Sequence, residues 1–207
     1  MINKILVFGD SIAYGKWDSL GGWVAQLRKH IDEKYNIDNN GNVQLFNLSI
    51  PGELAPRLAE RFENELKMRV DLDDECLVIL AIGVNDCNPN NKRAGRQTDK
   101  RVFTSAFNKM IQAARQNKCA IICIGFCPVN PKRSKGALFT NKEVKKYDEY
   151  LTQVCEEEKI PKLELFDELF AENFPDKLFD AAHPSGEGHK ILFEKIKSFL
   201  KSLHFID

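Results

Sequence analysis

The sequence predicts a three-layer α/β/α fold built on a doubly wound parallel sheet of five strands. Short apolar runs alternate along the chain with longer segments whose apolar residues recur at helical spacing. The apolar runs are continuous, which is typical of strands that are buried on both faces between two layers of helices. Helical connections between parallel strands are nearly always right-handed, and such connections give a doubly wound sheet.

Five apolar runs are predicted to be the strands of this sheet. Each is four to seven residues long, which is the usual length of a buried strand. The first run, ILVF, stops abruptly at Gly9, and the fourth lies within the cysteine-rich stretch KCAIICIGFCP. In chain order the predicted strands cover residues 5–8, 43–48, 76–82, 119–125 and 163–166.

The segments between and after these runs are predicted to be helices. The first has Val24, Leu27 and Ile31 on one side, and the second is rich in Glu, Arg and Lys. Pro184 is expected to start the last helix, because the missing N–H of proline costs nothing at that position. In chain order the predicted helices cover residues 23–35, 54–70, 102–116, 141–157 and 184–203.

Length and charge limit the classes of function. The 207 residues suit one domain, 1–207, and no repeat or linker divides them. Lys and Arg together number 30 and so do Asp and Glu, so no global charge indicates a nucleic acid partner or a membrane surface. The apolar run at 5–8 is too short for a signal peptide, and no run is long enough for membrane insertion. We therefore expect a cytoplasmic protein.

The six cysteines are expected to be buried free thiols. A chain of this size can build a core without disulfides. Cys119, Cys123 and Cys127 are spaced by four residues on a predicted strand, which separates them by roughly 13 Å at each step. They therefore cannot share a zinc ion. The six thiols are those of residues 76, 87, 119, 123, 127 and 155.

Polar residues that could take part in a reaction lie near the ends of the predicted strands. Ligands of such sheets bind beyond the carboxyl ends of the strands. Ser11 follows the first strand, Gly52 the second and Asn85 the third, while Asp180 and His183 precede the last helix. Alone, each has a simpler interpretation as a helix cap, a turn residue or an exposed loop histidine. Together they supply a nucleophile, an acid–base pair, a backbone donor and an amide donor, which acyl transfer requires.

The spacing of three residues between Asp180 and His183 favours a contact between their side chains. Residues three apart on one helical turn are neighbours, so the carboxylate can reach one ring nitrogen of His183. The other nitrogen is then free to take a proton from Ser11. The backbone N–H groups of Ser11 and Gly52 and the side-chain amide of Asn85 are the expected oxyanion-hole donors.

The blocks GDSI, Gly52, GVND and DAAHPS, in this order between Gly9 and His183, resemble the SGNH (GDSL-type) hydrolase family of esterases and acylhydrolases. The resemblance implies that Ser11 is the nucleophile, His183 the base and Asp180 the residue that orients it. It also implies that Gly52 and Asn85 serve the oxyanion hole, that the sheet is flavodoxin-like and that no cofactor is needed. One departure is Ser49 in NLSIPG, where the family often has a further glycine.

Three other interpretations compete with an esterase. A metal-dependent phosphohydrolase could use Asp10, but Ile12 stands where such enzymes carry a second carboxylate. A non-catalytic flavodoxin-like module would need a phosphate loop rich in Ser and Thr after the first strand, and SIAYGKW is not one. A degenerate relative without turnover is the last alternative, although the complete Ser, Asp and His set argues against it.

Two basic loops leave the same edge of the predicted sheet. One spans residues 92–101, with no acid before Asp99, and the other spans 132–135. They are either solvated surface or a basic collar that attracts a small acyl ester carrying a negative charge. On the second interpretation Arg93 and Arg133 are the candidate substrate-binding residues. The basic residues are Lys92, Arg93 and Arg96 before Asp99 in the first loop, and Lys132, Arg133 and Lys135 in the second.

Overall fold

The computed structural model describes residues 2–38, 41–89, 97–133 and 140–206. The described residues form one five-stranded parallel sheet in the order β2-β1-β3-β4-β5. This is the flavodoxin-like strand order, in which the chain switches direction between β1 and β3. The strands are β1 (Lys4–Gly9), β2 (Gln44–Asn47), β3 (Cys76–Ala81), β4 (Ala120–Ile124) and β5 (Lys162–Leu163). The prediction of a doubly wound α/β fold is confirmed.

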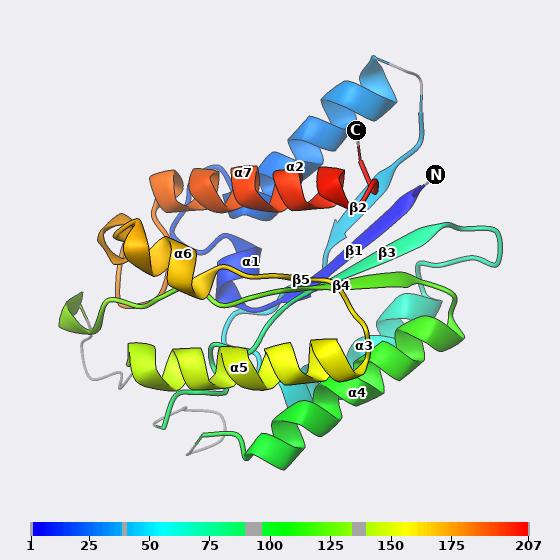
Figure 1. Cartoon of the computed structure of the whole chain (residues 1–207). Helices are drawn as coiled ribbons and strands as arrows, with labels where there is room; N and C mark the ends of the chain where they lie inside the picture. Colours follow the sequence, from blue (N-terminus) through cyan, green and yellow to red (C-terminus); the bar gives the residue numbers. More distant parts are fainter. Residues whose placement is uncertain (1, 39–40, 90–96, 134–139, 207) are drawn as a thin grey trace.

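Helices cover both faces of the sheet (Figure 1). On one face lie α2, α6 and α7, and on the other lie α3, α4 and α5. The helices are α1 (Ser11–Tyr14), α2 (Gly22–Ile31), α3 (Ala55–Lys67), α4 (Lys100–Gln116), α5 (Asn141–Glu157), α6 (Phe166–Ala171) and α7 (Gly186–Ser202). Helix α2 continues into a π-helical segment, η1 (Asp32–Ile37), and short 3₁₀ turns form η2 (Pro131–Arg133) and η3 (Phe174–Lys177).

Strand β1 shows why the sheet has a core on each side. Its side chains alternate, so Leu6 and Phe8 pack with α3 and α4, while Ile5 and Val7 pack with α2 and α7. All four are fully buried. Because burying one such side chain contributes roughly 1.5–3 kcal/mol, a strand that is apolar on both faces holds the two layers together. The end of β1 is thereby a rigid support for the residues that follow it.

Two predicted elements differ near the carboxyl end of the chain. The predicted strand 163–166 pairs with β4 only over β5, and Phe166 already begins α6. The last helix begins at Gly186, because the Ser185 hydroxyl caps it by accepting the Gly188 N–H at 3.3 Å. Pro184 therefore precedes the cap and does not start the helix.

The cysteines behave as expected. All six are free and buried, which confirms the prediction of buried thiols. Only Cys123 of the group around β4 lies within the strand itself, since Cys119 and Cys127 flank it. No helix in the described part of the chain is long and apolar enough to cross a membrane.

Candidate active site

Ser11 is the first residue of α1, directly beyond the carboxyl end of β1. Asp10 caps this short helix by accepting the Ile12 N–H at 2.9 Å, and Gly15 ends it in a left-handed conformation with φ 86°. The first N–H groups of a helix have no partner within the helix, so the turn presents the Ser11 N–H together with its hydroxyl. The Ser11 side chain is nevertheless largely buried, because other loops of the same sheet edge surround it.

Asp180 and His183 lie on a bend between η3 and α7 and not on a helical turn. The bend is closed by a bridge between Leu178 and Pro184 and by the Phe179 N–H, which donates to the His183 carbonyl at 2.8 Å. The Asp180 carboxylate accepts the backbone N–H groups of Ala182 and His183 at 3.0 and 2.9 Å. The spacing of three therefore brings the two side chains together, but through an Asp-centred turn.

Ser11, His183 and Asp180 form a continuous chain of hydrogen bonds. Ser11 Oγ lies 2.7 Å from His183 Nε2, and His183 Nδ1 lies 2.8 and 2.9 Å from the two carboxylate oxygens of Asp180. A carboxylate at Nδ1 favours the tautomer in which Nδ1 carries the proton and Nε2 accepts. The arrangement can accept a proton from Ser11 and hold it next to a carboxylate.

Burial and hydrogen bonds shift the pKa values of His183 and Asp180. Burial lowers the pKa of His183 below its usual value, and the hydrogen bond and charge of Asp180 only partly oppose this effect. Burial raises the pKa of Asp180, but hydrogen bonds from Ala182 and His183 outweigh it and leave that pKa below its usual value. At neutral pH the pair is therefore a neutral imidazole beside a carboxylate, as a general base requires.

Gly52 lies in a turn on the loop between β2 and α3. The Glu53 N–H donates to the Ile50 carbonyl at 3.1 Å across the turn, and Gly52 has φ 75°. Pro followed by Gly with positive φ matches a type II turn. The Ile50 N–H donates to the Gly9 carbonyl at 3.1 Å, which joins this loop to the end of β1. Among the described residues none accepts a hydrogen bond from the Gly52 N–H.

Asn85 is on the loop after β3 and contacts the loop of Gly52. Its side-chain Nδ2 donates to the Glu53 carbonyl at 3.2 Å. The loops that follow β1, β2 and β3 are thus joined to one another, by Ile50 and Gly9 on one side and by Asn85 and Glu53 on the other. Three adjacent strand ends bring the candidate oxyanion donors to the sheet edge that carries Ser11.

Asp10 and Asp86 are buried carboxyl groups behind this edge. Burial raises the pKa of each to about 7. Asp86 accepts the Thr98 hydroxyl at 2.6 Å and the Ala55 N–H at 3.0 Å, so it caps α3 from a neighbouring loop. Asp10 is only 2% exposed and caps α1, which is a structural position. No cluster of three or more metal-ligating side chains occurs among the described residues.

Trp17 is a residue near the triad that the sequence did not single out. Its indole Nε1–H donates to Asp180 Oδ2 at 3.1 Å, and its ring stacks on Phe179 with the centroids 5.4 Å apart. Trp17 has φ 70°, a conformation that costs roughly 1–3 kcal/mol in a bulky residue. No sequence signal indicates this contact, because Trp17 and Asp180 are 163 residues apart.

The basic loops are only partly described. Arg133 lies on the exposed turn η2, where its Nη1 donates to the Leu178 carbonyl. The Asn130 N–H also donates to the Ala181 carbonyl at 2.8 Å, so η2 is attached to the bend that carries Asp180 and His183. The basic residues that lie outside the described residues are Lys92, Arg93, Arg96 and Lys135.

Comparisons with known proteins identify a family and related folds. Residues 7–191 match the model of the GDSL-like lipase/acylhydrolase family. No curated protein sequence matches the chain.

Several solved structures share the fold. An acetyl xylan esterase, AlAXEase, has a TM-score of 0.77 at 19% identity, with 95% of this chain and 99% of that chain covered. The lipase/acylhydrolase from Enterococcus faecalis has a TM-score of 0.74 at 21% identity, covering 97% and 96% of the two chains. TesA has a TM-score of 0.72 at 22% identity, covering 97% and 99%.

Proposed function

The chain belongs to the GDSL-like lipase/acylhydrolase family, and from this premise we propose that it hydrolyses carboxylic esters with Ser11, His183 and Asp180 as a catalytic triad. The observation that carries the proposal is the unbroken chain of contacts from Ser11 Oγ through His183 to Asp180, at 2.7 and 2.8 Å. Serine hydrolases on unrelated folds share this arrangement of groups.

The first half of the reaction acylates Ser11. His183 Nε2 takes the hydroxyl proton as Ser11 Oγ attacks the ester carbonyl, and Asp180 stabilises the imidazolium that forms. The carbonyl oxygen becomes an oxyanion, to which the N–H groups of Ser11 and Gly52 and the amide of Asn85 donate. His183 then gives its proton to the leaving alcohol, and the acyl group stays on Ser11.

The second half releases the acid. A water molecule gives a proton to His183 Nε2 and attacks the acyl carbonyl, and the same donors stabilise the second oxyanion. When the tetrahedral intermediate collapses, Ser11 Oγ leaves and takes the proton back from His183. The products are a carboxylic acid and the original enzyme, and no cofactor takes part in these steps.

We also propose that the substrate is a small acyl ester that carries a negative charge. Two cationic side chains near the triad support this. The charge of Lys16 acts on His183, and Arg133 binds the Leu178 carbonyl two residues before Asp180. Arg93 belongs to the same proposal on the grounds of sequence alone.

Replacing Ser11 by Ala tests the proposed function. We expect kcat for a short p-nitrophenyl ester to fall by about 10³-fold or more, because the nucleophile is removed. Ser49→Ala is a matched control, since this serine lies at the same sheet edge and its buried hydroxyl has no hydrogen-bond partner among the residues that the structure describes. Activity of Ser11→Ala within tenfold of the parent would refute the triad.

The same assay separates the esterase from a metal-dependent phosphohydrolase. The triad chemistry needs no metal, so ester hydrolysis is expected to persist in the presence of a chelator. A phosphate monoester that is cleaved only with added Mg²⁺, together with an Asp10→Asn variant that loses this activity, would instead favour the phosphohydrolase.

A further inference from the structure

The loop from residue 48 to residue 54 carries Gly52 but has few backbone hydrogen bonds of its own. The Leu48 N–H donates to the Val7 carbonyl at 2.8 Å, and the Ile50 N–H donates to the Gly9 carbonyl at 3.1 Å. Both contacts lie before the turn that contains Gly52. A third, from the Glu53 N–H to the Ile50 carbonyl at 3.1 Å, closes the turn itself but does not attach it to another element. The position of Gly52 therefore depends also on side chains that hold the second half of the loop.

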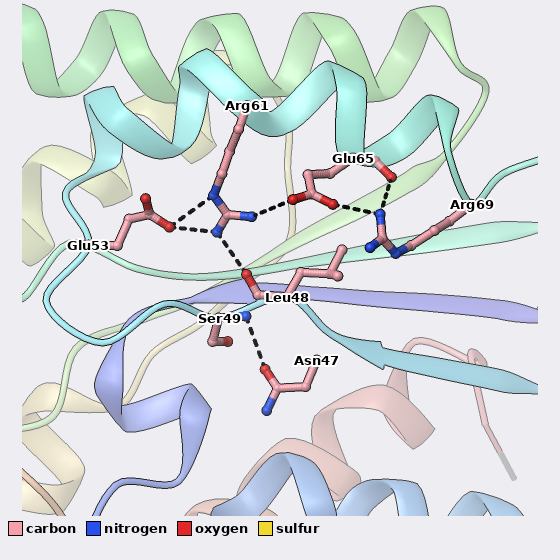
Figure 2. A network of polar contacts seen from close by, with 7 residues as sticks. All are labelled: Asn47, Leu48, Ser49, Glu53, Arg61, Glu65 and Arg69. Carbon is pink, nitrogen blue, oxygen red and sulfur yellow. Dashed lines mark hydrogen bonds and ion pairs between the residues drawn. The ribbon is translucent and has the colours of Figure 1, made fainter.

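One side chain, that of Arg61 on α3, binds both ends of this loop (Figure 2). Its Nη2 donates to the Leu48 carbonyl at 2.7 Å. Its Nε and Nη2 both donate to Glu53 Oε2, at 3.0 and 2.5 Å. The guanidinium is planar and rigid, so it fixes where Leu48 and Glu53 lie relative to each other. Gly52 lies between these two anchored residues.

The Glu53 carboxylate is buried and depends on Arg61 as its cationic partner. Its side chain is 4% exposed, and a buried carboxylate without a cationic partner is costly. Arg61 is held on its other side as well, because its Nη1 donates to Glu65 Oε1 at 3.2 Å. Glu65 in turn accepts from Arg69 Nη1 at 2.6 Å. Arg61 is therefore oriented before any substrate binds.

Glu53 also accepts a hydrogen bond from Asn85, which is the second candidate oxyanion donor. Its backbone carbonyl accepts Asn85 Nδ2 at 3.2 Å. The Gly52 N–H is the donor immediately before Glu53 in the chain. Both donors that lie outside the Ser11 turn are thus fixed through Glu53, whose side chain Arg61 holds.

We propose that Arg61, paired with Glu53, is a positioning residue of the oxyanion hole. It holds the loop so that the Gly52 N–H and the Asn85 amide point at the developing oxyanion. Arg61 acts through Glu53 and Leu48 and has no contact with the reacting atoms. The inference rests on the proposed function, because it assigns a support to the oxyanion hole of that reaction.

Two variants of the pair test the proposal. Arg61→Lys keeps a positive charge near Glu53 but lacks the fork that also reaches the Leu48 carbonyl. The double variant Glu53→Gln/Arg61→Met removes the pair without leaving an unpaired buried charge. We expect each to lower kcat by about 10–100-fold and to change KM by less than about threefold, because misplaced donors affect mainly the transition state.

Lys67→Met is the matched control. It removes another cation of α3, whose exposed ion pair with Glu63 at 2.6 Å does not involve Arg61, Glu65 or the loop. Its kcat is expected to equal that of the parent. Thermal unfolding of every variant checks that the assays measure folded protein. If the double variant does not fold, Arg61→Lys alone tests the proposal, because it keeps the positive charge.

A double-mutant cycle with Asn85→Ala separates positioning from a merely structural role. If Arg61 acts through the oxyanion hole, Arg61→Lys/Asn85→Ala loses less kcat than the product of the two single losses. Parent-like kcat in both Arg61 variants, or losses that multiply in the cycle, would overturn the proposal. Ser11→Ala is measured in parallel: if it is inactive while the Arg61 variants are active, only the role of Arg61 fails, whereas an active Ser11→Ala refutes the esterase triad itself.

Discussion

Asp180 accepts hydrogen bonds from two parts of the chain, and this arrangement determines what each neighbour contributes to the proposed triad. Oδ1 accepts two backbone N–H groups, those of Ala182 and His183, and Oδ2 accepts the Trp17 indole N–H. Both oxygens face His183 Nδ1. The two backbone donors belong to the same bend as Asp180, so they fix the carboxylate even without the indole. Trp17 adds a third donor from a distant part of the chain.

Substitutions at Asp180 and Trp17 should therefore differ greatly in effect. Asp180→Asn favours the wrong tautomer of His183, and we expect kcat to fall by about 10³–10⁴-fold. Trp17→Phe keeps a ring that can stack on Phe179 and removes only the N–H, so we expect a fall of less than about tenfold. Both values come from ester hydrolysis at saturating substrate. Equal losses in the two variants would show that the indole, and not the bend, orients Asp180.

The proposed catalytic residues could be singled out from the sequence because each lies a few residues after a strand or before a helix. Ser11 and Asn85 come at the end of apolar runs, and Asp180 and His183 are three residues apart. Trp17 could not be predicted, since its contact with Asp180 depends on how two distant loops pack. The prediction that a helical turn joins Asp180 and His183 is wrong, because a bend joins them.

At the scale of single elements, α1 is a short helix whose cap is a buried carboxyl group. Asp10 accepts the Ile12 N–H, and it lines a small, mainly apolar cavity of about 30 Å³. Burial raises its pKa to about 7, from an ordinary value of 3.8. The carboxyl group that begins the Ser11 turn therefore keeps its proton to a higher pH than an ordinary Asp does.

This shift makes a prediction about stability and pH. Between about pH 4 and pH 7 the folded protein keeps a proton on Asp10 that the unfolded chain has lost, so the contribution of Asp10 to stability falls as the pH rises through this range. Asn can accept the same Ile12 N–H without a charge. We expect Asp10→Asn to raise the melting temperature more at pH 8 than at pH 5. An equal change at the two pH values would contradict the raised pKa.

Other elements show where sequence patterns stop being informative. Helix α3 is rich in charged side chains, which are mostly found on exposed faces, yet Arg61 points back to a buried Glu53. The pattern of alternating charges is the same for a solvated pair and for a buried one. The sequence predicts a strand at 163–166, but β5 ends after Leu163, Leu165 is the N-cap of α6 and Phe166 begins that helix. Short apolar runs fit both structures.

At the scale of the whole molecule, strand order explains why four distant motifs meet. Parallel strands direct all their carboxyl ends to one edge, and β1 lies between β2 and β3 in the sheet. The loops of Ser11, Gly52 and Asn85 are therefore neighbours, as their hydrogen bonds show. This much could be predicted from apolar runs and right-handed connections. The contacts that hold the loops in place depend on side-chain packing, which the pattern does not encode.

The distribution of charge over the molecule leads to the last prediction. The chain has 30 basic and 30 acidic residues, so its overall charge does not attract an anion. A local field from Arg133 and Arg93 would attract one, and salt screens such a field over about 10 Å at 0.1 M. We expect kcat/KM for an anionic ester to fall with added NaCl, and kcat/KM for a neutral ester with the same acyl group to change little.

Charge reversal tests whether these two arginines are the source of the field. In Arg93→Glu/Arg133→Glu the salt dependence of the anionic ester should become equal to that of the neutral ester. Because Arg133 also donates to the Leu178 carbonyl, Arg133→Gln serves as a control that removes the charge but keeps N–H donors on the side chain. If Arg133→Gln keeps kcat for the neutral ester while the reversal removes the salt effect, charge and not loop geometry selects the substrate. Equal salt dependence of the two esters in the parent enzyme would make both loops ordinary solvated surface.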